Sequence, residues 1–322
     1  MSISLPNWVS ERNADIQRCL EETLFTPNAF VEEVARYLVD AGGKRYRPGI
    51  VVNAGALGIG RSNMDVVRLV RSATVIELTH VASLYHDDVM DEADTRRGRP
   101  ATHVKWSNSI AILVGDFMLA RASALGATLG EAAIIHQAET LARLVQGQIA
   151  ELSGPDQGVD PITHHLKVVS DKTASLISTA ARFGGLFGGL DPDQVEALAA
   201  YGEDLGLAFQ LADDLMDLLS DSSGKPQGTD LREGVPTLTT LLVQANPRPG
   251  DTRLLELLAY PVADENIPEA LGLLRTHPAL DEARAQIQTY ADQALAHLAV
   301  FPPSEALDGL KTLCHQAAIR TT

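Results

Sequence analysis

Six aspartates form two groups with the same i, i+1, i+4 spacing: Asp87, Asp88 and Asp91, then Asp213, Asp214 and Asp217. On a helix, the first and third members of each group lie one turn apart on one face. Each group ends a long apolar run, where burial disfavours the charged carboxylates and neighbouring charges repel. A divalent metal ion reverses both effects, and Mg²⁺ binds carboxylate oxygens together with water and substrate phosphates. An acidic solvated helix face is the alternative for either group alone. The repeated pattern instead predicts that the two groups face each other and bind a polyphosphate through Mg²⁺.

Basic residues accompany the first aspartate group. The stretch "GGKRYRP" (42–48) places three cations among glycines and a proline, and "RRGRP" (96–100) follows the aspartates directly. Guanidinium groups match phosphate bidentately, and glycine lets the backbone come close to an anion. Lys172, Lys225 and His80 are ordinary residues when each is taken alone. With the metal-binding pattern, these positions predict a site for two highly charged substrates.

The composition indicates a soluble helical protein. The chain has 322 residues, 45% of them hydrophobic and only 5% aromatic, and its formal net charge is −16, which excludes a general nucleic-acid binder. Cys19 and Cys314 define no disulfide framework or zinc site and suit a reducing cytoplasm. The first residues show no signal-peptide pattern. Asp116 and Arg121 interrupt the longest apolar window, so we expect no membrane-spanning helix.

Apolar residues recur at helical spacing along most of the chain. This periodicity predicts helices over 64–93, 107–129, 131–152, 162–184, 193–220, 235–245, 252–259, 267–275, 280–300 and 303–318. Asp191 and Pro192 are typical of a helix start. The segment 220–237 is too rich in Gly, Ser and Pro for a helix and is long for a connector, so we expect a functional loop. No strand or hairpin pattern appears. We therefore predict one all-α domain, 1–322.

The chain resembles the trans-prenyl diphosphate synthases. The resemblance is carried, in order, by "GGKRYRP", "HVASLYHDDVMDEADTRRGRPA", "GDFMLARA", "DKTASL", "FQLADDLMD" and "GKPQGTDLREGVPTL", and covers about residues 40–240. It implies a bundle of long helices around a central cavity, usually a homodimer. It also implies head-to-tail condensation of isopentenyl diphosphate with an allylic diphosphate, with farnesyl or geranylgeranyl diphosphate as the expected primer. We expect no nucleic-acid partner. The resemblance implies a transient contact with a membrane surface when the product is released.

The resemblance also implies roles for individual residues. The implied cofactor is Mg²⁺, with three ions per active site, and Mn²⁺ is the alternative. The six aspartates are implied as its ligands, and Asp214 and Asp217 act through metal-bound water. The residues implied for the allylic diphosphate are Arg96, Lys172 and Lys225, with Thr173 as a further substrate-binding residue and Gln210 near the reacting carbon. Those implied for isopentenyl diphosphate are Lys44, Arg47, His80 and Arg97. Asp87, Asp88, Asp91, Lys172, Gln210 and Asp213 form the catalytic set. One departure is that "EGVPTL" places Gly234 and Val235 where many short-chain members have a further lysine.

The product tunnel is expected to follow the helix that ends in Asp87. Ala82 and Ser83 lie one turn before this end, where short-chain relatives often have aromatic rings, so small side chains predict a product beyond twenty carbons. Phe117 and Met118 are alternative residues to close the tunnel. A geranylgeranyl-type synthase, a non-catalytic subunit of a heteromeric synthase, and a terpene cyclase or head-to-head synthase remain as other interpretations. Consumption of isopentenyl diphosphate distinguishes the last pair, and an assay of the purified chain alone tests the non-catalytic subunit.

Overall fold

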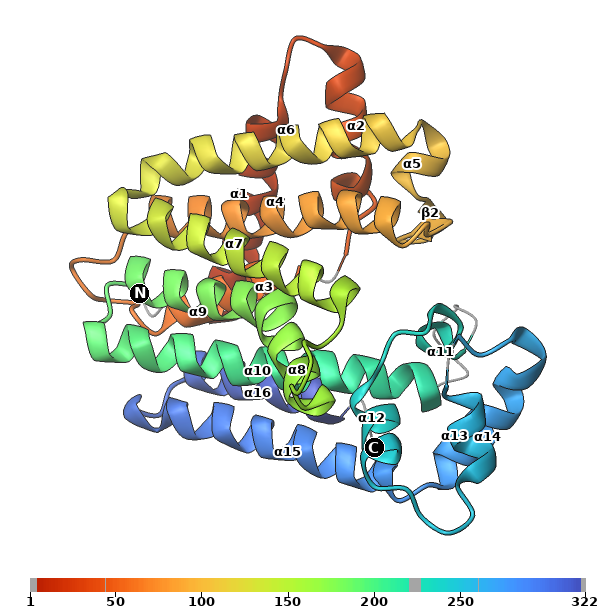
Figure 1. Cartoon of the computed structure of the whole chain (residues 1–322). Coiled ribbons are helices and arrows are strands. Elements are labelled where there is room, and N and C mark those ends of the chain that lie inside the picture. Colours follow the sequence, from red (N-terminus) through yellow and green to blue (C-terminus); the bar gives the residue numbers. More distant parts are fainter. Residues whose placement is uncertain (1–4, 44, 220–226, 260, 320–322) are drawn as a thin grey trace. The chain divides into compact units, whose positions relative to one another are not determined.

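Helices carry almost all of the regular structure in this computed structural model, which describes residues 5–43, 45–219, 227–259 and 261–319 (Figure 1). The prediction of an all-α fold is confirmed. The α-helices of the described residues are α1 (Leu5–Leu24), α2 (Ala29–Asp40), α3 (Tyr46–Ala56), α4 (Val66–Met90), α5 (Thr102–Lys105), α6 (Asn108–Gly126), α7 (Glu131–Ser153), α8 (Pro161–Val169), α9 (Ser175–Phe187), α10 (Pro192–Leu219), α11 (Thr229–Glu233), α12 (Leu238–Ala245), α13 (Thr252–Leu257), α14 (Ile267–Thr276), α15 (Ala279–His297) and α16 (Glu305–Ile319).

The helices group into two compact units. Unit 1 comprises the described residues within Met1–Ala142, Leu176–Ala199 and Val300–Leu310. Unit 2 comprises those within Arg143–Ser175, Ala200–Ala299 and Lys311–Thr322. The helices α7, α10 and α16 each continue along the chain from one unit into the other. The prediction of a single domain stays a prediction.

Helix α4 forms the centre of unit 1. Its residues 72–79 are all buried, because neighbouring helices cover the helix on every side. It packs along α6, which lies beside it, and also against α1 and α3 (Figure 1). Asp65 begins α4 by accepting a hydrogen bond from the backbone N–H of Arg68. This packing places the acidic end of α4 on a rigid element.

A short hairpin follows α4 and was not expected. The strands β1 (Thr95–Arg96) and β2 (Arg99–Pro100) pair antiparallel around the two residues Arg97 and Gly98. Both turn residues have positive φ, 53° and 72°, as a two-residue turn of type I′ requires. Arginine is uncommon in this conformation, so the turn is held by contacts elsewhere. The sequence has no period-2 run or Asn-Gly turn that would indicate this hairpin.

In unit 2, a π-helical turn, Ser170–Ala174, interrupts the helix predicted over 162–184. The backbone N–H of Ser175 donates to the carbonyl of Ser170, five residues earlier, which is the π-helical pattern. The remaining helices of this unit include α12, which packs against α15 and α8, and α14, which packs against α13 and α15. The interruption matters because the π-turn carries Lys172 and Thr173.

One further expectation needs correction, and another stays untested. The segment 220–237 contains a short helix, α11, whose two ends are Gly228 and Gly234 in the left-handed conformation, with φ of 71° and 70°. Residues 220–226 lie outside the described residues. Among the described residues, the stretch Asn108–Leu129 is long and apolar enough to cross a membrane by length and composition alone. The core helix of a soluble protein meets the same criterion, so the expectation of no membrane-spanning helix stays a prediction.

Candidate active site

The first aspartate group lies at the C-terminal end of α4 in unit 1. Asp91 caps the helix and donates its backbone N–H to the carbonyl of Asp87, at 2.8 Å. Asp88 is fully buried and accepts a hydrogen bond from Nε of Arg96, at 2.6 Å. Burial raises the pKa of Asp88, although the charge of Arg96 opposes this. Arg96 belongs to the hairpin, so the turn brings a predicted diphosphate ligand onto a predicted metal ligand.

A cluster of arginines surrounds one buried carboxylate in the same unit. Glu77 is 2% exposed, and its Oε1 lies 2.5 Å from Nη1 of Arg45 and 3.7 Å from Nη2 of Arg97. Arg97 also donates to the carbonyl of Leu38 at 2.7 Å, which holds the hairpin turn in place. Arg45, like Arg97, has positive φ, at 46°. Two strained arginines therefore share one buried counter-charge.

Arg47 and His80 extend this cluster. Nη1 of Arg47 lies 3.3 Å from Nε2 of His80; because a guanidinium only donates, this nitrogen accepts and the imidazole is neutral. Burial, and then the charges of Arg47 and Arg97, lower the pKa of His80 well below 6.5. Burial also lowers the pKa of Arg47, whose Nε is buried without a hydrogen-bond partner in the described structure. Such an excess of buried donors over acceptors suits an anionic ligand. Lys44 lies outside the described residues.

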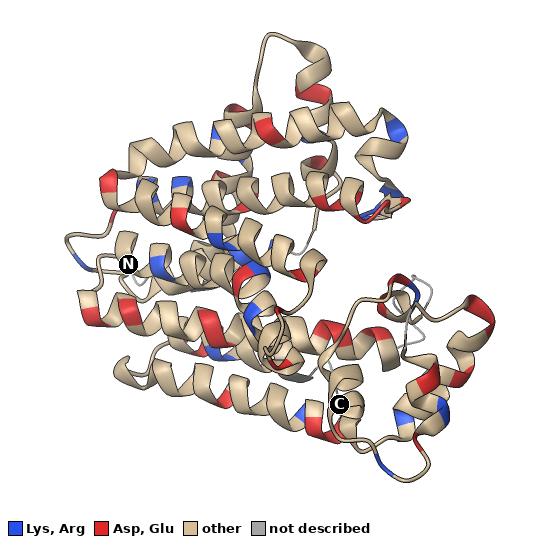
Figure 2. Cartoon of the chain, in the orientation of Figure 1, with Lys and Arg blue, Asp and Glu red and all other residues tan. Residues whose placement is uncertain are grey.

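The second aspartate group lies near the C-terminal end of α10 in unit 2, where acidic residues follow one another (Figure 2). Asp214 accepts a hydrogen bond from Gln210 at 2.8 Å, and Gln210 in turn accepts one from the hydroxyl of Thr173 at 3.0 Å. Burial, and then the charge of Asp213, raise the pKa of Asp214 to about 7. Three predicted site residues are thus joined in one hydrogen-bonded chain.

A further carboxylate, Asp230 at the start of α11, joins this group. Its backbone N–H donates to Oδ2 of Asp217 at 3.1 Å. Burial, followed by the charges of Asp214 and Asp217, raises the pKa of Asp230 to about 8. Sequence reasoning missed this residue, although "GTDLREG" sits in a segment that we expected to be functional.

Lys172 forms an ion pair with Glu151 of α7, which sequence reasoning also missed. His165 is 3.9 Å from Asp214, but burial lowers the pKa of its imidazole to about 4, so the pair is not an ion pair. Lys225 lies outside the described residues. Helical spacing does not indicate Glu151 as the partner of Lys172 or His165 as the neighbour of Asp214, because each comes from another part of the chain.

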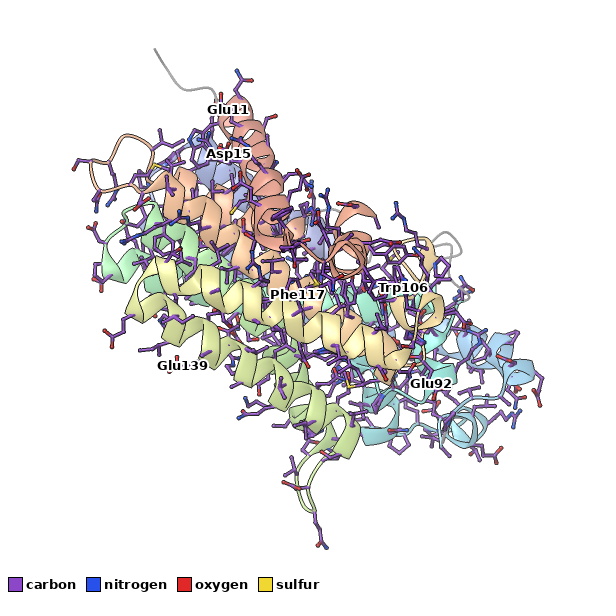
Figure 3. All side chains as sticks on the ribbon, turned by 90° about the horizontal axis from the view of Figure 1, so that it is seen from above. Glu11, Asp15, Glu92, Trp106, Phe117 and Glu139 are labelled. Carbon is purple, nitrogen blue, oxygen red and sulfur yellow. The ribbon has the colours of Figure 1, made fainter. Side chains whose placement is uncertain are left out.

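The residues predicted to close the product tunnel differ in exposure. Ala82 and Met118 are fully buried, whereas Ser83 and Phe117 are half-buried. Figure 3 labels Phe117 on α6. Ser83 lies one turn before Asp87 on a half-buried strip of α4 that also contains His80 and Leu84. Their role stays a prediction, and so does the prediction that both aspartate groups border one cavity.

The described residues contain no group of three His, Cys, Asp or Glu side chains arranged to hold a metal ion unaided. The donor set still fits Mg²⁺, which is often bound by one or two carboxylates and completed by water and phosphate oxygens. Oδ2 of Asp88 is buried and has no hydrogen-bond partner among the described atoms, as a carboxylate oxygen reserved for a cation would be.

Comparison with known proteins identifies the family. The polyprenyl synthetase family model matches residues 28–273. The chain is 43% identical to nonaprenyl diphosphate synthase of Mycobacterium tuberculosis, covering 90% of this chain and 86% of the relative. It is 32% identical to octaprenyl diphosphate synthase of Escherichia coli, covering 95% of each chain.

Solved structures agree with these relatives. Decaprenyl diphosphate synthase from Rhodobacter capsulatus matches with a TM-score of 0.88 and 31% identity, over 99% of this chain and 98% of that one. Geranylgeranyl pyrophosphate synthase from Corynebacterium glutamicum, complexed with calcium and isoprenyl diphosphate, matches with a TM-score of 0.88 and 34% identity, over 98% and 97% of the two chains. The chain belongs to the polyprenyl synthetase family and is a prenyltransferase.

Proposed function

We propose that this enzyme condenses isopentenyl diphosphate head-to-tail with an allylic diphosphate, releases diphosphate and makes a long all-trans polyprenyl diphosphate. The observation that carries the proposal is the part-buried arginine cluster of unit 1, in which Arg45, Arg47 and Arg97 outnumber the one carboxylate, Glu77, that pairs with them among the described residues. Part-buried cations in excess of carboxylates suit an anionic ligand, because each such charge is costly to keep away from water without a counter-charge.

The arginine cluster is assigned to the diphosphate of isopentenyl diphosphate. Arg47 presents a buried, unpaired Nε–H, and Arg97 is held by Leu38 and Glu77. Neutral His80 accepts from Arg47 and so fixes the orientation of its guanidinium without adding a positive charge. Preorganised donors of this kind bind a diphosphate without reorganising.

Within unit 2, the allylic diphosphate is assigned to Lys172 with Thr173 and Gln210. Within unit 1, Arg96 is proposed as a diphosphate ligand beside Asp88. When bound, Mg²⁺, the proposed ion with Mn²⁺ as the alternative, would neutralise the negative charge that grows on the leaving diphosphate. The residues that would hold the ion are Asp87, Asp88 and Asp91 in unit 1 and Asp213, Asp214 and Asp217 in unit 2. Gln210 orients Asp214 through its amide, while the hydroxyl of Thr173 fixes the amide of Gln210.

A long product is favoured by two observations. Relatives over most of the chain's length include nonaprenyl and octaprenyl diphosphate synthases. The half-buried strip of α4 before Asp87 carries the small residue Ser83. Farnesyl or geranylgeranyl diphosphate is the proposed primer, and a geranylgeranyl product is the alternative.

The proposed assembly is a homodimer. Helix α7 exposes an apolar stripe at i, i+4 and i+7, where Val145, Ile149 and Leu152 are 46%, 59% and 68% exposed. Stripes of this kind are normally covered by a partner. Replacing Ile149 and Leu152 with Glu should yield a monomer in light scattering. An unchanged dimer would assign its interface elsewhere.

The proposed location is the cytoplasm, which suits the two free thiols. Product release is proposed to involve brief contact with a membrane surface, since a long prenyl chain is insoluble in water.

The test is a product assay on the purified chain alone. Isopentenyl diphosphate, Mg²⁺ and either geranyl, farnesyl or geranylgeranyl diphosphate are incubated, and the dephosphorylated alcohols are analysed by mass spectrometry. We expect a ladder of alcohols that differ by one five-carbon unit and extend beyond twenty carbons. No consumption of isopentenyl diphosphate with any primer would refute the proposal, and a ladder ending at twenty carbons would refute the long product.

A further inference from the structure

The π-turn of unit 2 carries two of the proposed substrate ligands on an unusual backbone. Its hydrogen bond spans five residues, from the N–H of Ser175 to the carbonyl of Ser170, in place of the four of an α-helix. A turn of this kind persists when the surrounding structure determines it from several sides. The contacts around Ser170–Ala174 therefore decide where Lys172 and Thr173 project.

Helices α7 and α10 approach the π-turn closely through glycine. A Cβ atom on Gly147 would lie 2.6 Å from the backbone nitrogen of Lys172, and one on Gly206 would clash with Cα of Ala174. Neither position has room for a side chain. The backbones of the two helices therefore contact the turn directly.

One turn before each glycine, the same helices present opposite charges. Arg143 lies four residues before Gly147 on α7, and Glu203 lies three residues before Gly206 on α10. Nη2 of Arg143 donates to Oε1 of Glu203 at 2.8 Å, and its Nε donates to Oδ1 of Asp171 at 2.9 Å. This guanidinium thus joins α7, α10 and the π-turn.

The turn itself completes the network. The hydroxyl of Ser170 donates to Oε1 of Glu203 at 2.6 Å and accepts from Nη2 of Arg143 at 3.0 Å. Asp171 is 6% exposed and is also paired with Lys167 of α8. Hydrogen bonds to Glu203 and Asp171 raise the pKa of Arg143 against the effect of its burial, so its charge is secure.

We infer that Arg143, with Glu203, is a positioning residue that holds the π-turn so that Lys172 and Thr173 meet the allylic diphosphate. Arg143 acts through Ser170 and Asp171, and Glu203 acts through Ser170 and Arg143. This inference rests on the proposed role of Lys172. A lysine at position 143 supplies one point charge in place of the planar fork, so it cannot serve both carboxylates in the same way.

The matched control is Arg182 in unit 1. It joins α9 to α10 through a bidentate pair with Glu196, whose second contact is 2.7 Å. Arg182→Met therefore removes an interhelical Arg–Glu pair of the same type without touching the π-turn. We expect Arg182→Met to leave both KM values, kcat and the exchange of residues 170–176 as they are in the wild type.

The experiment compares Arg143→Met, Arg143→Lys and Glu203→Gln in the full-length enzyme. We expect Arg143→Met to raise the KM for the allylic diphosphate about 10-fold or more, the usual size of an effect through a supporting residue. The KM for isopentenyl diphosphate should stay within about twofold, since its proposed ligands are elsewhere. Arg143→Lys should recover only part of the loss. A general loss of folding would instead change both KM values or lower the active fraction.

A second readout does not depend on activity. Hydrogen exchange of residues 170–176 should be faster in Arg143→Met and in Glu203→Gln. When the two substitutions are combined, their effects on exchange should be less than additive, because each removes the same contact between Arg143 and Glu203. If Arg143→Met fails to fold, Glu203→Gln, which keeps the bond between Arg143 and Asp171, gives the same test. Unchanged exchange together with an unchanged allylic KM would overturn the inference.

The Lys172→Ala variant separates this inference from the proposed function. If Lys172→Ala leaves the allylic KM unchanged while Arg143→Met speeds exchange, the positioning of the turn is upheld and the allylic role of Lys172 falls. If Lys172→Ala raises the allylic KM and Arg143→Met changes neither readout, the role of Lys172 is upheld and Arg143 is not its positioning residue.

Discussion

Replacing Asp230 with Asn should make the metal-free protein less sensitive to alkaline pH. Asp230 lies beside Asp217 in unit 2, where burial and neighbouring carboxylates raise its pKa to about 8. The model-compound value is 3.8, so between pH 3.8 and 8 the folded chain binds a proton at Asp230 that the unfolded chain has lost. The stability linked to this proton is present below pH 3.8 and is lost as the pH rises through 8.

The size of the effect follows from the two raised pKa values. Each titrating proton changes the free energy of unfolding by about 1.4 kcal/mol per pH unit. Between pH 6.5 and 8.5, the folded chain holds a proton at Asp230 that the unfolded chain has lost over about 1.5 pH units. The same holds at Asp214, whose pKa is about 7, over about half a pH unit. Over this pH range the free energy of unfolding should fall by up to about 3 kcal/mol in the wild type and by about 0.7 kcal/mol in Asp230→Asn. These are upper values because the two carboxyl groups interact.

The assay is urea unfolding in EDTA at pH 6.5, 7.5 and 8.5, repeated with saturating Mg²⁺. Mg²⁺ should reduce the pH dependence of the wild type, because the ion favours the ionised carboxylates. Asp160→Asn is the control: Asp160 caps α8, its hydrogen bonds to Thr163 lower its pKa, and it titrates below this pH range. The same decline with pH in the wild type and in Asp230→Asn, both without metal, would refute the reasoning.

Three further substitutions probe other parts of the structure. Ser83→Phe should shorten the product ladder seen by mass spectrometry, and an unchanged ladder would exclude this strip of α4 as the tunnel wall. Ala82→Phe changes a fully buried position, so overpacking should lower the free energy of unfolding by about 1–3 kcal/mol. Asp88→Asn leaves Arg96 without its buried counter-charge, so kcat should fall and the Mg²⁺ concentration for half-maximal activity should rise; unchanged Mg²⁺ dependence would remove Asp88 from the metal site. Gly206→Ala places a methyl group against the π-turn, so thermal unfolding should occur at a lower temperature and the allylic KM should rise, and a variant with wild-type values would contradict the close contact.

The helices that carry the aspartate groups were predictable because their signal is local. Apolar residues repeat at helical spacing up to Asp87 and Asp213, and α4 and α10 end close to where that periodicity stops. The family motifs likewise use residues that are close in sequence. What a single helix determines could therefore be predicted from the residues of that helix.

The features that sequence reasoning missed depend on residues far apart in the chain. The π-turn adds one residue to a helix without disturbing the apolar pattern enough to be seen, and the hairpin at Arg97 is too short to show alternation. Glu77 and Asp230 are ordinary acidic residues until the fold brings Arg45 or Asp217 to them. These pairings depend on tertiary packing, which periodicity does not report.

The π-turn also bears on how this segment changes in evolution. A π-turn is equivalent to one inserted residue in an otherwise regular helix, so deleting one residue between Pro161 and Phe187 would allow a plain α-helix with complete backbone bonding. The helices on either side would keep their faces, but the residues inside the turn would project in new directions, and Lys172 would no longer be held opposite Glu151. The number of residues in this segment therefore matters as much as their identity, because the extra residue is what gives the proposed ligands Lys172 and Thr173 their present directions.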